Sequence, residues 1–183
     1  MFFKVVENFL PKQVFDRLLM IVESEELKWH WSASTHYDEN KKGVDNNFML
    51  SKMIFNHKQS TGGHYEDKQY LQLFCLIADY QQSIKKANDL IRMKLNLYPN
   101  QGKNVKHAKH ADMMLDKKID NRFMTSIFNF HTCNGSTVIE LDDKIEEVKS
   151  KANQLIMFDN TWHYGITQSD TPRRIVLNIN VLK

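Results

Sequence analysis

The second half of the chain changes from a helical to an alternating pattern of apolar residues, and this change constrains the fold more than any other feature. In RMKLNLY, Met93, Leu95 and Leu97 alternate with residues of other kinds. Further short segments follow, with turns at Asn134-Gly135 and Asp142-Asp143: FMTSIFNF, TVIEL, KIEEVKS, NQLIMF and RIVLNINVL. Alternation with a period of two buries one face of a strand. The pattern predicts antiparallel β structure, closed into a barrel or folded as a sandwich.

The first half carries two helical patterns and three segments that resemble strands. Pro11 suits the start of a helix, and an apolar face at helical spacing follows it, formed by Phe15, Leu18, Leu19 and Val22. A second stripe begins at Tyr70 and predicts one long helix or two consecutive ones, with Phe74, Ile77, Ile84 and Ile91 on one face. Strands are predicted at VVENFL, at FMLSKMIF, and at a sheet edge where Trp29 and Trp31 share a face. Helices first and strands later predict one α+β unit.

Composition narrows the class of protein. With 183 residues and no repeat or linker, we expect a single domain over residues 1–183. Two cysteines make no disulfide framework, so Cys75 and Cys133 are expected as free thiols in a reducing cytoplasm. The first residues lack the apolar core of a signal peptide, and no stretch approaches the roughly 20 apolar residues of a membrane span. A net charge of +3 without charged blocks gives little reason to expect a nucleic-acid partner, and we expect a soluble, cytoplasmic protein.

The run VKHAKHADMMLD, residues 105–116, concentrates candidate metal ligands. In a helix, His107 and His110 would share a face. In a strand, His110 and Asp112 point to the same side and His107 to the other. A loop rich in Asn, Gly and Lys precedes the run, and strand patterns follow it, so the strand is favoured. The predicted pair is therefore His110 and Asp112, with His107 a solvated residue or one that supports the ligands.

A third ligand must come from elsewhere in the chain. His131 precedes the Asn-Gly turn, at the expected end of a hairpin. His163 lies in MFDNTWHYG, directly after an apolar strand. With His163 the set is two histidines and one carboxylate, the facial arrangement that leaves positions open on Fe(II).

Arg174 lies on the polar face of the last predicted strand. Its neighbours on that face are Asn178 and Asn180, and the opposite face is apolar. An arginine on the side of a cavity is costly unless it meets an anion, and its forked guanidinium suits a carboxylate.

The ordered set of His110-Ala-Asp112, His163 and Arg174 resembles the signature of the Fe(II)- and 2-oxoglutarate-dependent oxygenases. The segments LNLYP, NGST and MFDNTWHYGITQSDTPRRIVLNINV resemble the small prolyl-4-hydroxylase-like members of phages and marine bacteria. This resemblance extends over essentially the whole chain. It implies a double-stranded β-helix, a jelly-roll barrel related to the cupins, with the N-terminal helices packed on the outside of one sheet.

The resemblance also implies cofactors and roles. His110, Asp112 and His163 would hold Fe(II), 2-oxoglutarate would chelate the metal, and Arg174 would bind its distal carboxylate. Tyr98, Asn96 and Thr125 are further candidates for contact with the cosubstrate. The alternation of side chains along the strand agrees with the role of Tyr98, because burying the apolar face of RMKLNLY turns Tyr98 into the barrel.

The implied activity is a 2-oxoglutarate-dependent dioxygenase that consumes O₂, hydroxylates a C–H bond and releases succinate and CO₂. The site of action would be the host cytoplasm if a phage encodes the chain. The substrate stays open between a peptidyl proline, another protein or peptide, and a small molecule. We expect selectivity in residues 29–47 and in residues 56–68, which could form a lid. The alternatives are a cupin-type isomerase or metal-binding domain, and a binding protein without catalysis.

Overall fold

The chain folds into two helices and a set of short antiparallel strands. The computed structural model describes residues 1–35, 42–43, 47–57, 63–85 and 89–183, and no side chain of residues 81–85. Within these residues the elements, in chain order, are β1 (Phe3–Val6), α1 (Lys12–Val22), β2 (His30–Ser32), β3 (Met49–Asn56), β4 (Tyr65–Glu66), α2 (Lys68–Lys85), β5 (Asp89–Pro99), β6 (Met114–Leu115), β7 (Lys118–Ile119), β8 (Phe123–Asn129), β9 (Ser136–Glu140), β10 (Ile145–Lys149), β11 (Gln154–Asp159), β12 (His163–Ile166) and β13 (Arg173–Leu182).

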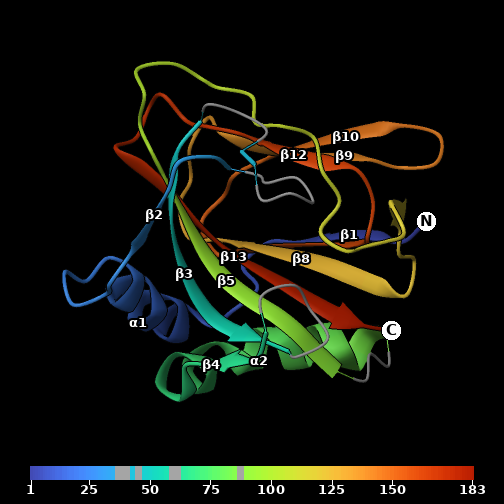
Figure 1. Cartoon of the computed structure of the whole chain (residues 1–183). Helices are drawn as coiled ribbons and strands as arrows, with labels where there is room; N and C mark the ends of the chain where they lie inside the picture. The colour runs from blue at the N-terminus through green and yellow to red at the C-terminus, as the bar shows by residue number, and fades with distance from the viewer. Residues whose placement is uncertain (36–41, 44–46, 58–62, 86–88) are drawn as a thin grey trace.

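Most strands form a large and a small sheet on opposite sides of one cavity, and β6 and β7 form a separate two-stranded sheet. The large sheet has the order β1-β11-β8-β13-β5-β3-β2, with β4 beside β3, and the small sheet has the order β10-β9-β12. In Figure 1, α1 and α2 lie on one side of the large sheet, and β9, β10 and β12 lie on the other. Residues of both sheets line the cavity between them. The sequence left open a barrel or a sandwich, and the chain forms two facing antiparallel sheets.

The alternation in β5 and β13 separates the two faces of the large sheet. The strands pair antiparallel, with Tyr98 opposite Arg174 and Lys94 opposite Asn178. The apolar side chains of both strands are buried in one core cluster with residues of α1 and α2, including Phe15, Leu18, Phe74, Ile77, Met93, Leu95, Ile175 and Leu177. The alternating side chains of the opposite face line the cavity. The predicted alternation is confirmed, and it places a polar surface on the side of the small sheet.

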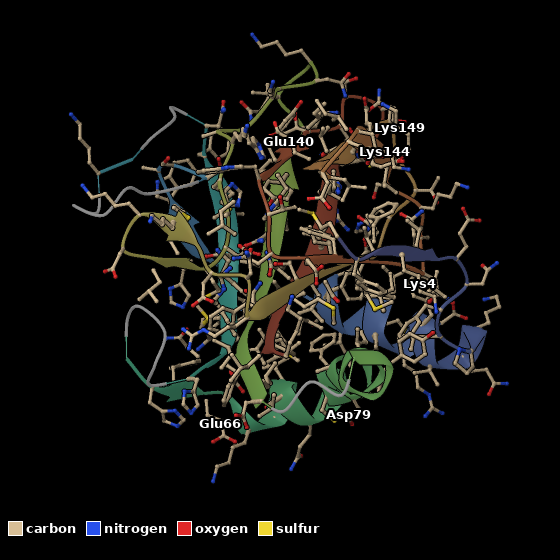
Figure 2. The ribbon with its side chains drawn as sticks, turned by 90° about the vertical axis from the view of Figure 1, so that its right-hand side faces the viewer. Lys4, Glu66, Asp79, Glu140, Lys144 and Lys149 are labelled. Atoms are coloured by element: carbon tan, nitrogen blue, oxygen red, sulfur yellow. The ribbon has the colours of Figure 1, made fainter. Side chains whose placement is uncertain are left out.

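Charged side chains occupy the outer surface at both ends of the molecule. Figure 2 shows Glu140, Lys144 and Lys149 beside the small sheet, and Glu66 and Asp79 on the side of α2. Neither helix in the described part of the chain is long and apolar enough to cross a membrane. Both cysteines are free, Cys75 half-buried and Cys133 buried.

Two sequence predictions about element boundaries were wrong. Ile91 lies in β5 and not on the second helix. Ile91 follows Ile84 at helical spacing and also precedes Met93 at strand spacing. The apolar pattern alone is therefore compatible with either a helix or a strand at this residue. The Asn134-Gly135 pair is not a hairpin turn, because it connects β8 of the large sheet to β9 of the small one. A Cβ atom on Gly135 would lie 3.0 Å from the carbonyl oxygen of Ile166, so glycine serves close approach there.

The two tryptophans near β2 have different environments, against the prediction of a shared half-buried face. Trp31 is 62% exposed and stacks on Phe48 with ring centroids 4.7 Å apart. Trp29 packs against the core cluster. The possible lid at residues 56–68 and the segment 29–47 lie partly outside the described residues.

Candidate metal centre

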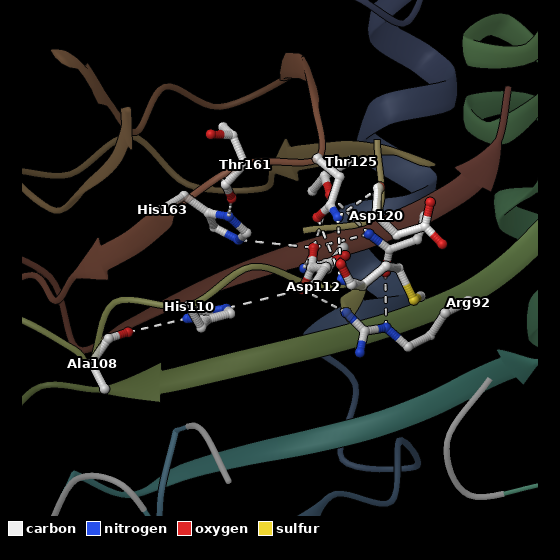
Figure 3. Close-up of polar contacts among 12 residues, drawn as sticks. Arg92, Ala108, His110, Asp112, Asp120, Thr125, Thr161 and His163 are labelled. Atoms are coloured by element: carbon white, nitrogen blue, oxygen red, sulfur yellow. Dashed lines mark hydrogen bonds and ion pairs between the residues drawn. The ribbon is translucent and has the colours of Figure 1, made fainter. Parts of the chain in front are cut away.

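His110, Asp112 and His163 come together in the cavity between the two sheets. One ligand atom from each lies within 4.8 Å of the others. The Nε2 atom of His163 is 3.8 Å from Oδ2 of Asp112, and Nε2 of His110 is 4.0 Å from Oδ1 (Figure 3). Two cis donors that bind one ion at about 2.1 Å each are about 3.0 Å apart, so small side-chain movements of about 1 Å would bring both pairs onto one metal.

Backbone carbonyls fix which ring nitrogen of each histidine faces the cavity. The Nδ1 atom of His110 lies 3.1 Å from the carbonyl oxygen of Ala108, and Nδ1 of His163 lies 2.9 Å from that of Thr161 (Figure 3). A carbonyl oxygen only accepts hydrogen bonds, so each Nδ1 donates and each Nε2 keeps its lone pair. This is the ring orientation that outer partners impose on metal-binding histidines.

A backbone bridge holds the two histidines side by side. The amide of His110 donates to the carbonyl of His163 at 3.0 Å, and the amide of His163 donates to the carbonyl of His110 at 2.8 Å. The ring centroids are 4.5 Å apart. The metal-ligand geometry therefore depends on pairing between segments that are far apart in the sequence.

The segment that carries His110 is not the regular strand that the sequence predicted. Its described pairings with β12 are isolated bridges, Lys106 with Ile166 and His110 with His163. From Lys106 to His110 the chain advances four residues, whereas from His163 to Ile166 it advances only three. The segment that carries His110 therefore contains one extra residue, as in a β-bulge. The extra residue changes the parity, and His107 therefore lines the same cavity as His110. The prediction that His107 points to the other side was wrong: it is only 5% exposed, and its ring lies 4.9 Å from that of Tyr98.

Four side-chain donors surround the carboxylate of Asp112. Arg92 donates to Oδ1 at 2.6 Å, and Thr125, Asn180 and Asn178 donate to Oδ2 at 3.0, 2.9 and 3.3 Å. Burial favours the protonated form, but the positive charge of Arg92, the two histidines and the Asn180 hydrogen bond hold the pKa of Asp112 well below its usual range. The carboxylate is therefore kept ionised and oriented.

Thr125, a candidate for contact with the cosubstrate because of the alternation along its strand, contacts Asp112 in the structure. Its side chain is fully buried and donates to Asp112, and the residues that line the cavity do not include it. It orients a predicted metal ligand, and its hydroxyl also accepts a hydrogen bond from Asn180 at 3.0 Å.

Arg174 lies deep in the cavity, 2% exposed, with neutral partners. Its guanidinium donates to the carbonyl oxygen of Ser136 at 2.9 Å, to Oγ1 of Thr137 at 3.0 Å and to Oδ1 of Asn129 at 3.2 Å. Burial lowers the pKa of Arg174, and within the described residues no carboxylate forms an ion pair with it. A buried cation with neutral partners is costly unless an anion joins it, so this end of the cavity suits a carboxylate ligand.

The cavity-facing side of β5 adds a row of polar side chains. Tyr98 and Asn96, both expected near the cosubstrate, line the cavity, and so do Lys94 and Arg92. Burial and the neighbouring Arg92 lower the pKa of Lys94 to about 8, and Asp112 opposes this effect. Lys94 and Arg92 were not proposed from the sequence as site residues, although the alternation that placed Tyr98 and Asn96 on this face also places them there.

The competing third ligand, His131, lies outside the cavity. Its Nε2 is 2.8 Å from a carboxylate oxygen of Glu23, and its Nδ1 accepts a hydrogen bond from the amide of Ile175 at 3.2 Å. Both ring nitrogens are thus engaged. Among the described histidines, only His110 and His163 belong to a group that could hold a metal ion, which favours His163 as the third ligand.

The chain is similar to solved structures of prolyl hydroxylases. A prolyl hydroxylase from Trichoplax adhaerens, solved with a peptide fragment of the hypoxia inducible factor oxygen degradation domain, has a TM-score of 0.67 at 11% identity, covering 98% of this chain and 83% of that one. A Pseudomonas putida prolyl-4-hydroxylase has a TM-score of 0.63 at 16% identity, covering 99% and 91%.

A viral enzyme shows the same similarity in fold. The viral collagen prolyl hydroxylase of Paramecium Bursaria Chlorella virus-1, solved as a 2-oxoglutarate complex, has a TM-score of 0.58 at 15% identity, covering 100% of this chain and 97% of that one. No protein-family model and no curated protein matches the chain. At these identities the similarity shows a shared fold, the antiparallel jelly roll of these oxygenases.

Proposed function

We propose that this protein is an Fe(II)- and 2-oxoglutarate-dependent dioxygenase that hydroxylates a C–H bond of its substrate. The observation that carries the proposal is the pair of His110 and His163 rings, each with Nδ1 bonded to a carbonyl and Nε2 turned toward the ionised carboxylate of Asp112. Two imidazoles and one carboxylate suit Fe(II) and leave coordination positions open. The similarity in fold to known 2-oxoglutarate oxygenases supports the same reading.

The proposed cosubstrate site lies at Arg174. Its buried guanidinium would bind the distal carboxylate of 2-oxoglutarate, and Tyr98, opposite it on β5, would lie beside the bound molecule. Asn96 is the next residue toward the metal on the cavity-facing side of β5. An alternative reading as a cupin-type isomerase or metal-binding domain leaves a buried cation without a ligand to explain it.

The site residues of this chain would bind and position the reacting groups, and none of these residues has to act as an acid or base. Bound Fe(II) with 2-oxoglutarate and O₂ supplies the oxidation, with succinate and CO₂ as products. His110, Asp112 and His163 would fix the metal, and Thr125 would orient the carboxylate of Asp112. The apolar side chains of Ile127 and Val176, which line the cavity, would help to exclude water from the reacting groups.

The proposal treats residues 1–183 as one oxygenase domain, since the large sheet joins β1 to β13. A peptidyl proline is one candidate substrate, because the similar structures are prolyl hydroxylases, and a small molecule is another. The two free cysteines support action in a reducing cytoplasm, that of a host if the chain is phage-encoded.

The test is turnover of 2-oxoglutarate by the purified protein. Incubation with Fe(II), 2-oxoglutarate and air should yield succinate, measured by chromatography, and the Asp112→Ala variant should yield none because it no longer binds iron. Asp143→Ala, which changes an exposed aspartate of the β9–β10 turn, is the matched control. Tight iron binding by the Asp112→Ala variant would contradict the assignment of the metal centre.

A further inference from the structure

Lys94 is a cation in the cavity for which the proposed reaction has no use. It is half-buried on β5 and lines the cavity. Within the described part of the chain, its amine has no hydrogen bond or ion pair. Arg92, two residues earlier on the same face, already pairs with Asp112 at 2.6 Å. Lys94 is therefore available to a ligand.

The anions of the proposed reaction already have partners. One carboxylate of 2-oxoglutarate would lie on Arg174, and the other would chelate the metal. Asp112, the one acidic side chain that lines the described cavity, pairs with Arg92 and would also hold the metal. With these groups in place, the charge of Lys94 remains unmatched, and an unmatched charge in a partly dry cavity is unfavourable.

The register of β5 and β13 puts Lys94 far from the cosubstrate anchor. Lys94 lies opposite Asn178, whereas Tyr98 lies opposite Arg174, four residues along the same strand. Four residues of strand span about 13 Å. The carbon chain of a five-carbon diacid, with bonds of about 1.5 Å, spans roughly 5 Å. A diacid bound at Arg174 therefore leaves the region around Lys94 to another molecule.

Asn178, opposite Lys94, offers that molecule a hydrogen-bond acceptor. Its Nδ2 donates to Oδ2 of Asp112 at 3.3 Å, and because a carboxylate only accepts, this contact fixes the orientation of the amide. The Oδ1 atom of Asn178 is buried and has no hydrogen-bond partner among the described residues. The residue is 7% exposed and lines the cavity, so a ligand with an N–H donor would satisfy it.

We propose that the primary substrate presents a carboxylate to Lys94 and an adjacent N–H group to Asn178, as a free amino acid or the C-terminal residue of a peptide does. This proposal rests on the proposed function, since it names the substrate class of the same site. The carboxylate would hold the substrate by its charge, and the acceptor of Asn178 would set its orientation next to the metal.

A halide soak tests the anion site without any knowledge of the substrate. Crystals of the wild-type protein and of Lys94→Met, each loaded with Mn(II) and 2-oxoglutarate, are soaked in bromide, and anomalous scattering locates the ion. We expect bromide within ion-pair distance of the Lys94 amine in the wild type and none there in the variant. Absence of bromide at Lys94 in the wild type would overturn the proposal.

A panel of matched compounds tests the substrate class. The panel contains L-amino acids, dipeptides with a free C-terminus, and the C-terminally amidated counterpart of each, and the readout is stimulated succinate formation. The acids should stimulate at least tenfold more than their amides, and Lys94→Met should remove this preference whereas Lys28→Met, an exposed control, should keep it. Equal stimulation by the amides, or no active acid, counts against the proposal. Activity with single amino acids would identify a free amino acid as the source of the carboxylate, and activity only with dipeptides would identify the C-terminal residue of a peptide.

Cosubstrate affinity separates this proposal from the proposed function. The dissociation constant of 2-oxoglutarate should change less than twofold in Lys94→Met, and a tenfold increase would assign Lys94 to the cosubstrate instead. If wild-type protein binds no 2-oxoglutarate, the proposed function fails. Bromide binding at Lys94 can also be measured in crystals without 2-oxoglutarate. Failure of the proposed function therefore does not prevent the test of the anion site, and the two failures are distinguishable.

Discussion

Replacing Arg174 with methionine should remove cosubstrate binding and leave the metal centre intact. In the folded protein Arg174 is 2% exposed, and the partners of its guanidinium are two neutral side chains and two backbone carbonyls. The carboxylate of 2-oxoglutarate would be the counter-charge of this cation. Loss of one member of a buried ion pair costs about 3–5 kcal/mol.

This energy sets the expected change in affinity. At 1.4 kcal/mol for each factor of ten, the dissociation constant of 2-oxoglutarate should rise at least about 100-fold in Arg174→Met. Arg174→Lys keeps the charge but loses the planar fork, so its affinity should lie between those of the wild type and the methionine variant. The measurement is anaerobic calorimetry on protein loaded with Mn(II).

The adjacent arginine provides the control. Arg173 points away from the cavity and donates to Glu23 at 2.9 Å, so Arg173→Met should leave the affinity for 2-oxoglutarate unchanged. Metal affinity, measured by competition with a chelator, should stay within about threefold in all three variants. A dissociation constant for Arg174→Met within threefold of the wild-type value, or an equal loss of metal affinity, would refute the reasoning.

Three further substitutions test how the site and its surroundings are held. Thr125→Val removes a donor to Asp112, so metal affinity should fall about tenfold with little effect on 2-oxoglutarate; the reverse pattern in the two titrations would restore Thr125 as a cosubstrate contact. Gly135→Ala puts a Cβ atom 3.0 Å from the carbonyl oxygen of Ile166 and should lower the free energy of unfolding by about 1–3 kcal/mol in urea denaturation. No change in this assay would show that the backbone around Ile166 can shift to admit the Cβ atom. Asn153 bonds both the amide and the carbonyl of Leu10, at 2.8 and 2.7 Å, so Asn153→Ala should cost about 2–4 kcal/mol by the same assay; a loss below 1 kcal/mol would mean that water replaces both contacts.

The alternation of side chains along the strands predicted correctly that Arg174, Tyr98 and Asn96 share a polar face, and this face lines the cavity. The alternation of β13 placed Arg174 on a polar face, and that of β5 placed Tyr98 and Asn96 on the matching face, because both strands are regular over these residues and bury their other face against helices. The same alternation contained Arg92 and Lys94. The sequence alone does not indicate a role for either residue, because a lysine or arginine at a strand position is usually solvated, and only the second sheet makes this face an interior one.

Parity failed where the backbone is irregular. The extra residue between Lys106 and His110 reverses the face of His107, and a bulge of this kind depends on the pairing partner β12, which the sequence did not predict. The selection of His110 and Asp112 was unaffected because both lie beyond the irregularity. The prediction of a hairpin at the Asn-Gly pair failed for a related reason: glycine at position 135 allows the close approach of the Ile166 carbonyl in β12 and does not form a hairpin turn.

The alternation of β5 and β13 couples stability to function. A slip of β5 by one residue against β13 would turn Arg92 and Lys94 toward the helices and would expose Met93 and Leu95 to the cavity. Burying the cations in an apolar layer without anions is far more costly than burying neutral polar groups. The charges that suit the cavity to carboxylate ligands therefore also oppose the wrong register, so the residues proposed to bind ligands contribute to specifying the fold.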